Sequence, residues 1–504
     1  MGKETYKSGA IKLIIAGFLV RLMGFANRIF MSNLIGAEGM GLFQLTSPVY
    51  SLIILTLTAG VSISVSSMTA QEKAKGNEQN ALRIAKTGFA FLLGLGLIIS
   101  VLLVFSAKYI AVNILGDERT YLSLVLLAPC IPIVAAASSI KGYFYGSMQV
   151  TPTAISQVVE QIVRIGVIFV LAVQISKQNL AYACALATVS AAIGEMANLA
   201  VVGIVFYKES KKPFLKEATL SRRKTAIVIG KQSIPVSINR FLTSIMGTVE
   251  AILLPARLLV GGLDYTSSIE TLGRLSGMAS PLIYFPTVIT SALATTLVPA
   301  ISQALSLRRH RLANMRISRC IKLSFLLGFA CFAGFYTFGD YIGEFFYKGQ
   351  NVGGILKNMS WLCILLYLQQ TMMGILNGLG KQAYALFSTT LGYTVRIGFI
   401  WFIVPIYGVN GYILGSAMSM LVMTIIDIIY LVYQTKMFLD LKEWLVKPML
   451  PAIVIFSAGT FFLEYFKAFD YGWILAGILS CICGGIMAAL FYLNRFPQRR
   501  IRKI

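Results

Sequence analysis

Long apolar runs, separated by short polar segments, make up almost the whole chain. A bilayer-spanning helix needs about 20 apolar residues, and lipid leaves no other way to satisfy the backbone of such a run. The runs do not alternate apolar and polar positions as barrel strands do. The pattern therefore predicts an all-α integral membrane protein with about fourteen helices, at roughly 9–33, 40–69, 83–107, 119–142, 152–174, 179–206, 228–256, 272–303, 318–339, 354–378, 382–406, 409–433, 443–464 and 470–494.

Composition excludes a soluble protein. Apolar residues make up 57% of the chain and charged residues 13%, against about 45–50% and about 25% in soluble domains. The net charge of +24 is spread over short basic clusters between the apolar runs, which argues against a nucleic-acid partner. This distribution follows the positive-inside rule.

The same charges predict the orientation. With a cytosolic N-terminus, 31 of the 44 Lys and Arg residues fall in cytosolic segments, 8 in external segments and 5 inside helices. Both termini are therefore predicted in the cytosol. The first apolar run contains Arg21 and Arg28 and lacks a small-residue cleavage site, so it is predicted to be a span and not a signal peptide.

The chain repeats itself at a constant offset. Gly142 and Gly146 recur as Gly374 and Gly378, and the Val-Arg-Ile-Gly sequence at 163–166 recurs 232 residues later. Six helices separate the copies, so the halves have the same orientation. Each Gly-x-x-x-Gly motif predicts close helix packing. The predicted parts are an N-terminal lobe at 1–207, a cytosolic linker at 208–227, a C-terminal lobe at 228–435, and two further helices with a basic tail at 436–504.

Two arginines in the first helix are the strongest candidate binding residues. Arg21 and Arg28 lie seven residues apart, on one helical face, and Asn27 adjoins them. Guanidinium groups hold phosphate oxygens in bidentate fashion and stay charged, so this stripe predicts an anion site. The alternatives are snorkelling to a lipid headgroup and pairing with an acid on another helix.

The seventh and eighth helices offer further charges. Arg240 lies in the helix that corresponds to the first one, and it could complete a cationic cavity between the lobes. Glu250, ten residues further on, faces another side. Glu270 and Arg274 are four residues apart, so either they pair with each other or Arg274 meets the substrate.

Other charges inside the spans are candidates for ion coupling or for structural pairs. The spacing of Glu160 and Arg164 favours an intrahelical ion pair. Arg396 is the repeat mate of Arg164, without the matching acid. For Glu195 and Asp427, a coupling role and a structural pair both remain open.

No enzymatic chemistry emerges from the motifs. The seven cysteines are an odd number, mostly within apolar runs and without paired C-x-x-C motifs, so neither a disulfide framework nor a zinc site is predicted. The phosphate-binding loop of ATPases is missing, so direct use of ATP is not supported. We expect a transporter with no metal and no cofactor.

Three stretches of sequence resemble a known family. Residues 17–28, 35–45 and 141–164 are similar to the stage V sporulation protein B group, in the polysaccharide-transport branch of the multidrug/oligosaccharidyl-lipid/polysaccharide (MOP) flippase superfamily. The resemblance implies a MATE/MOP-like fold of two pseudo-symmetric six-helix lobes around a central cavity, plus two C-terminal helices. It places the protein in a bacterial cytoplasmic membrane.

The resemblance also implies a function. It implies a flippase that exports an undecaprenyl-pyrophosphate-linked sugar by alternating access, in this group lipid II for the spore cortex. Arg21 and Arg28, with Asn27, fit the cationic cavity of related flippases, and Arg240 and Arg274 are carried over on less distinctive sequence. The expected partners are the lipid-linked oligosaccharide, membrane lipids and cell-wall synthesis enzymes, with no nucleic acid. Coupling to the membrane potential, Na⁺ or H⁺ stays open.

Two alternative functions remain at this point. One is an ion-coupled multidrug antiporter of the same superfamily, which would use the acids within the spans (Glu160, Glu195, Glu250 and Asp427). The other is a non-transporting membrane scaffold for cell-wall enzymes. The excess of arginine within the membrane favours an anionic substrate over both.

Overall fold

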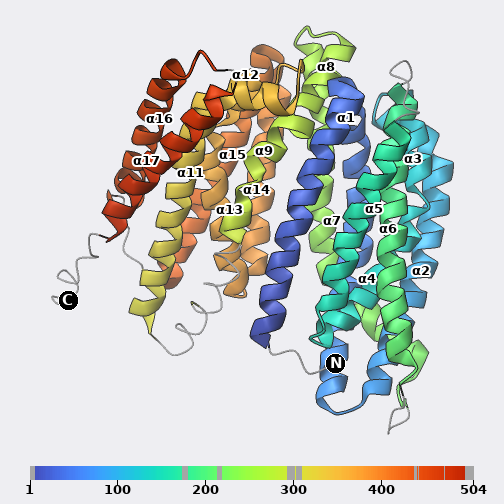
Figure 1. Cartoon of the computed structure of the whole chain (residues 1–504). Coiled ribbons are helices and arrows are strands. Elements are labelled where there is room, and N and C mark those ends of the chain that lie inside the picture. Colours follow the sequence, from blue (N-terminus) through green and yellow to red (C-terminus); the bar gives the residue numbers. More distant parts are fainter. Residues whose placement is uncertain are drawn as a thin grey trace. The chain divides into compact units, whose positions relative to one another are not determined.

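A computed structural model describes residues 6–172, 180–212, 218–291, 301, 309–435, 440, 442–469 and 471–493. Over these ranges the chain forms helices joined by short turns, without a strand (Figure 1). The predicted all-α class is therefore confirmed. The chain divides into two units by its internal contacts, and each is described by itself: unit 1 is 1–259 with 263–277, and unit 2 is 260–262 with 278–504.

Unit 1 contains the first helices of the chain and reaches into the π-helix η3. Its elements are α1 (Tyr6–Ala74), α2 (Glu78–Tyr109), η1 (Ile110–Ile114), η2 (Glu118–Thr120), α3 (Tyr121–Leu127), α4 (Cys130–Gly146), α5 (Thr151–Ala172), α6 (Leu180–Ser210), α7 (Arg222–Val260), α8 (Tyr265–Leu272) and η3 (Gly273–Ala279).

Unit 2 contains the remaining helices. They are α9 (Ser280–Tyr284), α11 (His310–Phe346), α12 (Gly353–Met359), α13 (Leu362–Gly378), α14 (Gln382–Phe402), α15 (Val404–Thr435), η4 (Lys442–Val446), α16 (Lys447–Tyr465) and α17 (Gly472–Leu493). The lobe boundaries predicted from the repeat stay predictions.

The helices are long enough for many membrane crossings. Within the described ranges, nine helices are long and apolar enough to span a membrane, or eleven when two bent helix pairs count as one span each. One of the nine covers 58 residues, Gly17–Ala74, which is ample for two crossings of about 20 residues. The chain is thus a multi-pass membrane protein, and the total of fourteen spans stays a prediction.

A single glycine interrupts α1. Gly36 has φ +73° and ψ −175° inside an otherwise continuous helical stretch. Glycine takes this conformation at little cost because it has no Cβ. The break lies within 34–39, the segment between the first two predicted helices, although helix continues up to both sides of Gly36. Gly408, with φ +56°, makes a similar break inside α15, which begins five residues before the predicted start at 409.

The predicted fourth span is bent shortly before Pro132. α3 and α4 meet at an angle of 40°, across a break of two residues. Pro132 lacks an N–H, and its ring clashes with the carbonyl four residues earlier, that of Ala128. Ser100 Oγ donates a hydrogen bond of 2.7 Å to this Ala128 oxygen. The bend therefore leaves the carbonyl satisfied.

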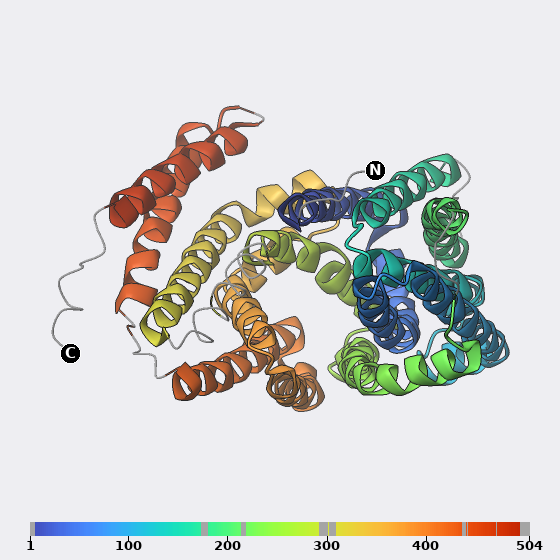
Figure 2. The ribbon, with the colours of Figure 1, turned by 90° about the horizontal axis from the view of Figure 1, so that it is seen from below.

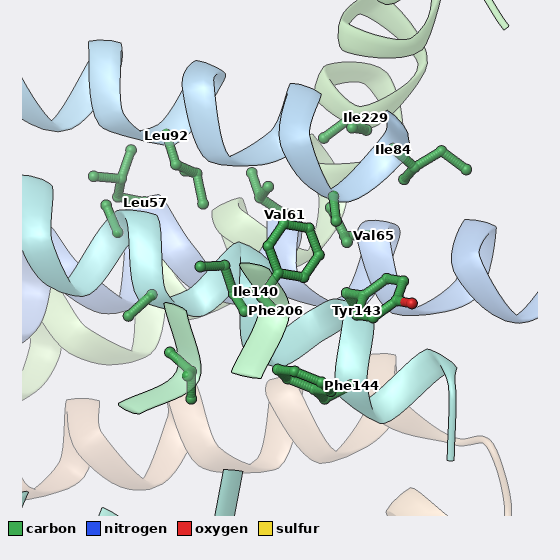
Figure 3. Close-up of a cluster of buried hydrophobic side chains, with 14 of the residues drawn as sticks. Leu57, Val61, Val65, Ile84, Leu92, Ile140, Tyr143, Phe144, Phe206 and Ile229 are labelled. Atoms are coloured by element: carbon green, nitrogen blue, oxygen red, sulfur yellow. The ribbon is translucent and has the colours of Figure 1, made fainter. Parts of the chain in front are cut away.

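The core of unit 1 lies where α1, α2, α4, α6 and α7 converge (Figure 3). Tyr143 of α4 and Phe206 of α6 meet edge to face, with ring centroids 5.2 Å apart, an arrangement that aromatic pairs prefer. A Cβ on Gly142 would lie 2.7 Å from the Ser62 oxygen, and one on Gly146 would lie 2.2 Å from a neighbouring α1 carbonyl. The close packing predicted for this Gly-x-x-x-Gly motif is confirmed.

The closest helix crossing in unit 1 joins α1 to α8 and η3. A Cβ on Gly41 would lie 2.1 Å from the Ile269 oxygen, and one on Gly273 would lie 1.9 Å from the Ala37 oxygen. Residues 41 and 273 are 232 positions apart, and so are residues 37 and 269. The crossing therefore consists of two equivalent contacts, because the two glycines are repeat mates and so are the residues whose carbonyls they face.

The last two helices attach to unit 2 through α11. α16 and α17 pack side by side, and α11 and α16 pack along each other (Figures 1 and 2). At the start of this pair, the buried Trp444 donates from Nε1 to Ser318 Oγ at 2.7 Å. Lys322 and Glu443 form an ion pair of 3.0 Å beside it.

Candidate functional site

The arginine stripe predicted from the sequence lies on α1. Arg21 is exposed, Arg28 is partly buried and Asn27 is 8% exposed. Seven residues correspond to about 10 Å along a helix, so the two guanidinium groups leave the helix two turns apart. Between Tyr6 and Ala37 the helix contains no acidic residue. This stretch of α1 thus contains positive charges and no acidic residue of its own to neutralise them.

A polar side chain from α5 reaches this stripe. Gly24 lies three residues after Arg21 and four before Arg28, so it belongs to the same face. The Gln161 Oε1 atom lies 3.7 Å from the position of a Cβ on Gly24. The oxygens Gln161 Oε1 and Asn27 Oδ1 are buried and accept no hydrogen bond from the described residues. An amide thus stands beside the cationic face, with capacity to bind a hydroxyl group.

The other predicted cationic residues differ in their surroundings. Arg274 Nη2 pairs with Glu270 Oε2 at 2.8 Å, which is the intrahelical pair that the spacing allowed. Arg240 is exposed on α7, and Glu250 is partly buried on the same helix. A place for Arg240 or Arg274 beside the α1 stripe stays a prediction.

A charge cluster lies between α5 and α6. Arg164 Nη2 is 2.8 Å from Glu160 Oε1, so the predicted ion pair is present, and 3.9 Å from Glu195 Oε1. Asn198 Nδ2 donates to the other oxygen of Glu160 at 2.6 Å. Gly194 lets the two helices approach, because a Cβ there would be 3.1 Å from the Glu160 carbonyl oxygen. Asn198 was not predicted from the sequence, although an amide three residues after Glu195 in the same apolar run could have indicated it.

This cluster contains two carboxylates for one guanidinium group. Glu160 and Arg164 expose 10% and 23% of their side chains, and Glu195 exposes 18%. Buried charge of one sign is unfavourable unless a partner neutralises it. Lys141 also acts electrostatically on Glu195, so two carboxylates lie near two cations, and the coupling role of the cluster stays a prediction.

Unit 2 contains a different polar group on α15. Asp427 is 2% exposed, and its Oδ1 accepts no hydrogen bond from the described residues. The buried hydroxyls of Ser416, Ser419 and Thr424 on the same helix likewise have no partner there. Arg396, the repeat mate of Arg164, stacks its guanidinium group 5.3 Å from the Tyr393 ring centroid. The two repeat-related arginines thus have different environments.

One ion-pair network that sequence reasoning missed lies next to the Gly36 break. Arg119 Nη1 is 2.6 Å from Glu38 Oε1, and Arg119 Nη2 is 2.8 Å from Asp117 Oδ2. Burial opposes the ionisation of Asp117, but hydrogen bonds from the Arg119 side chain and backbone outweigh it, so the pKa of Asp117 lies below its usual range. Tyr265 of α8 donates to the Gly116 oxygen at 3.2 Å. The network therefore ties the α1 corner to η2, with α8 beside it.

The described residues contain no group of three or more His, Cys, Asp or Glu side chains placed to hold a metal ion. The seven cysteines are free thiols.

The helices and the charges buried among them define a multi-pass α-helical membrane protein. Comparison of sequences then gives the family: the polysaccharide biosynthesis protein profile matches residues 7–305, so the chain belongs to this family. The membership predicted from the sequence motifs is confirmed.

Curated relatives cover most of the chain. It is 29% identical to stage V sporulation protein B of Bacillus subtilis (strain 168), over 84% of this chain and 83% of that protein. It is 24% identical to the lipid II flippase MurJ of the same organism, over 82% of this chain and 79% of the relative. These similarities extend over both predicted lobes.

Solved structures share the fold. The lipid II flippase MurJ in an inward closed conformation matches with a TM-score of 0.71 at 15% identity, covering 95% of this chain and 98% of that one. An inward-facing multidrug resistance MATE family transporter matches with a TM-score of 0.67 at 17% identity, covering 85% and 98%. The fold is thus common to transporters with different substrates.

Proposed function

We propose that this protein is a flippase for an undecaprenyl-pyrophosphate-linked sugar, and that the substrate is lipid II. The observation that carries the proposal is the α1 stripe, where Arg21 and Arg28 flank the Gln161 amide and no acid lies between Tyr6 and Ala37. Arginine forks suit the pyrophosphate oxygens. The amides of Gln161 and Asn27 suit sugar hydroxyls.

The relatives support the same substrate class. Two of them bear the names stage V sporulation protein B and lipid II flippase, and each aligns over four fifths of this chain or more. Spore cortex synthesis is the setting that the first name suggests.

The mechanism follows from the substrate's chemistry. The anionic head cannot cross hydrocarbon unaided, whereas the polyprenyl tail can stay in the bilayer. Arg21 and Arg28 hold the pyrophosphate while two lobes alternate in access around a central cavity. A membrane potential negative inside favours outward movement of negative charge by about 2.3 kcal/mol per charge per 100 mV. In this proposal both termini lie in the cytosol and the protein resides in the bacterial cytoplasmic membrane.

Ion coupling would use the remaining charges. Glu160 and Glu195 are two carboxylates beside Arg164, and Asp427 is a buried acid on α15. The carboxylates beside Arg164 or that of Asp427 can take up a proton or Na⁺ during the transport cycle.

The test is transport of fluorescent lipid II in reconstituted vesicles, with and without an imposed potential. Hydrogen bonds to charged groups contribute about 1.5–3 kcal/mol each, so Arg21→Ala/Arg28→Ala lowers the rate at least about tenfold. The matched control is Arg222→Ala/Arg223→Ala, which removes the same charge from exposed positions of α7. Wild-type rates in the α1 double variant would overturn the proposal.

A second candidate is an ion-coupled multidrug antiporter. The two carboxylates around Arg164 favour it, because acids within a span can bind a cation during transport. Vesicles that move a cationic dye against a Na⁺ or H⁺ gradient, but leave lipid II in place, would support this function. A non-transporting scaffold would move neither compound.

A further inference from the structure

A groove in unit 2 is independent of the transport site. It has a volume of about 470 Å³ and is lined by residues of α11, α12 and α15, together with Ser360 and Trp361 between α12 and α13. Its residues fall into a polar group and an apolar group. Lys357, Asn358 and Asn410 form the polar part, while Phe332, Ile413 and Leu414 belong to the apolar part.

The two groups lie at different depths along the helices. Lys357 and Asn358 are within five residues of the start of α12, and Asn410 is six residues from the start of α15, which places their backbones about 6–9 Å from these ends. Phe332 is 14 residues before the end of α11, or about 21 Å along it. The groove is thus polar near the helix ends and apolar further in.

Aromatic side chains accompany the polar part. Tyr336, Trp361 and Tyr407 also line the groove, and Tyr336 and Tyr407 are 48% and 66% exposed. Trp and Tyr are enriched where membrane meets water, since each combines an apolar ring with a polar atom. A polar end with aromatic rings, followed by an apolar floor, therefore matches the order of headgroup and acyl chain in a membrane lipid.

The charge of the groove selects the headgroup. Lys357 is the charged residue among those lining it. Its ammonium pairs with Asp340, which is 58% exposed and lies outside the lining. An ammonium has three donors, so it can bind a second anion. Asn358 Nδ2 lies 3.3 Å from Asn410 Oδ1, which brings both amides to the same place.

We infer that this groove binds one anionic phospholipid from the leaflet on the side of the 347–352 turn. The phosphate lies against Lys357 and the amides of Asn358 and Asn410, and one acyl chain runs along Phe332 and Leu414. A soluble sugar would leave the apolar floor uncovered. Leu414 is 45% exposed, so the floor is open for a chain to enter laterally.

Native mass spectrometry of the purified full-length protein tests this inference. The delipidated protein is titrated with phosphatidylglycerol and with phosphatidylcholine of the same acyl chains. One basic residue near a membrane surface contributes about 1 kcal/mol to binding an anionic lipid, so Lys357→Gln lowers the phosphatidylglycerol affinity about fivefold. Phosphatidylcholine binding stays close to wild type. Lys348→Gln, an exposed lysine in the adjacent turn, is the matched control and retains wild-type affinity.

A second variant tests the floor without changing charge. Leu414→Trp fills the groove and lowers binding of both lipids, whereas Leu421→Trp, two turns along α15 and 37% exposed, leaves both unchanged. Thermal unfolding of each variant verifies that it is folded. Wild-type affinities in Lys357→Gln and Leu414→Trp would overturn the inference. So would preferential binding of a soluble amino-sugar disaccharide, added as a competitor, that Leu414→Trp leaves intact.

Discussion

Gln44 donates a hydrogen bond of 2.7 Å from Nε2 to the backbone oxygen of Ser276, and these residues are 232 positions apart. This separation is also the offset of the sequence repeat. In a structure with two-fold pseudo-symmetry, a residue meets its own mate only near the axis. The crossing of α1 with α8 and η3 therefore marks the local pseudo-two-fold axis.

Alanine at the crossing glycines should destabilise the fold. Gly41→Ala and Gly273→Ala each place a Cβ about 2 Å from a backbone oxygen of the facing helix, and overpacking of this kind costs about 1–3 kcal/mol. We expect a lower thermal unfolding temperature in detergent for both. Gly94→Ala on α2 is the control, because a Cβ there meets nothing within 4 Å. Equal unfolding temperatures for all three variants would contradict the tight crossing.

Removing one member of the α5–α6 charge cluster should cost more than breaking an exposed pair. Arg164→Gln leaves Glu160 and Glu195 without their cation, and breaking a buried pair costs about 3–5 kcal/mol. Glu195→Gln in the same background should recover part of the loss. Lys108→Gln, which breaks the exposed pair with Glu118, should change stability by about 0–1 kcal/mol. Unfolding temperatures of the three variants and of wild type measure these losses, and similar losses for Arg164→Gln and Lys108→Gln would argue against the cluster.

Acid should destabilise the corner at Gly36 through Asp117. The folded-state pKa of Asp117 is lowered, so its contribution to stability is complete above the unfolded-state pKa of about 3.9 and is lost as the pH falls below it. Asp117→Asn should be less stable at pH 6 and lose less stability between pH 6 and pH 3. Glu118→Gln, at a carboxylate 72% exposed, should follow the wild-type pH profile. If the stability of Asp117→Asn depended on pH as that of wild type does, the loss of stability in acid could not be attributed to Asp117.

Cysteine accessibility can establish the orientation. A membrane-impermeant maleimide, applied to intact cells, should label Lys348→Cys, in a turn predicted to be external. It should label Lys75→Cys, in a predicted cytosolic turn, only after the membrane is opened. Wild type supplies the baseline, because its seven cysteines lie within helices. The reverse labelling pattern would invert the predicted topology.

Much of the fold was readable in the sequence because lipid imposes a strict rule on apolar runs. The helices, the repeat and the close approach at Gly142 follow from hydropathy and from glycine spacing. A boundary at 34–39 was predicted, but the sharp corner at the single residue Gly36 was not, since a glycine inside an apolar run looks the same in a straight helix and at a sharp corner. The bend before Pro132 could not be predicted without the position of the backbone carbonyl with which the proline ring clashes.

The candidate site was predicted only where its members are close in sequence. Spacing by four gave the Glu160–Arg164 and Glu270–Arg274 pairs. Arg119 contacts Glu38, which is 81 residues away in the sequence. Asn198 contacts Glu160, which is 38 residues away. Such contacts depend on which helices become neighbours, and hydrophobic periodicity does not specify neighbours.

The symmetric crossing also has a bearing on how the chain arose. An ancestral half-length protein, inserted twice in the same orientation, would have met its own copy through this very glycine and carbonyl. One substitution in that ancestor would have altered both halves of the contact together. In this chain Gly41 and Gly273 each face the other's helix. The crossing thus has, within a single polypeptide, the form of a symmetric contact between two copies of one motif.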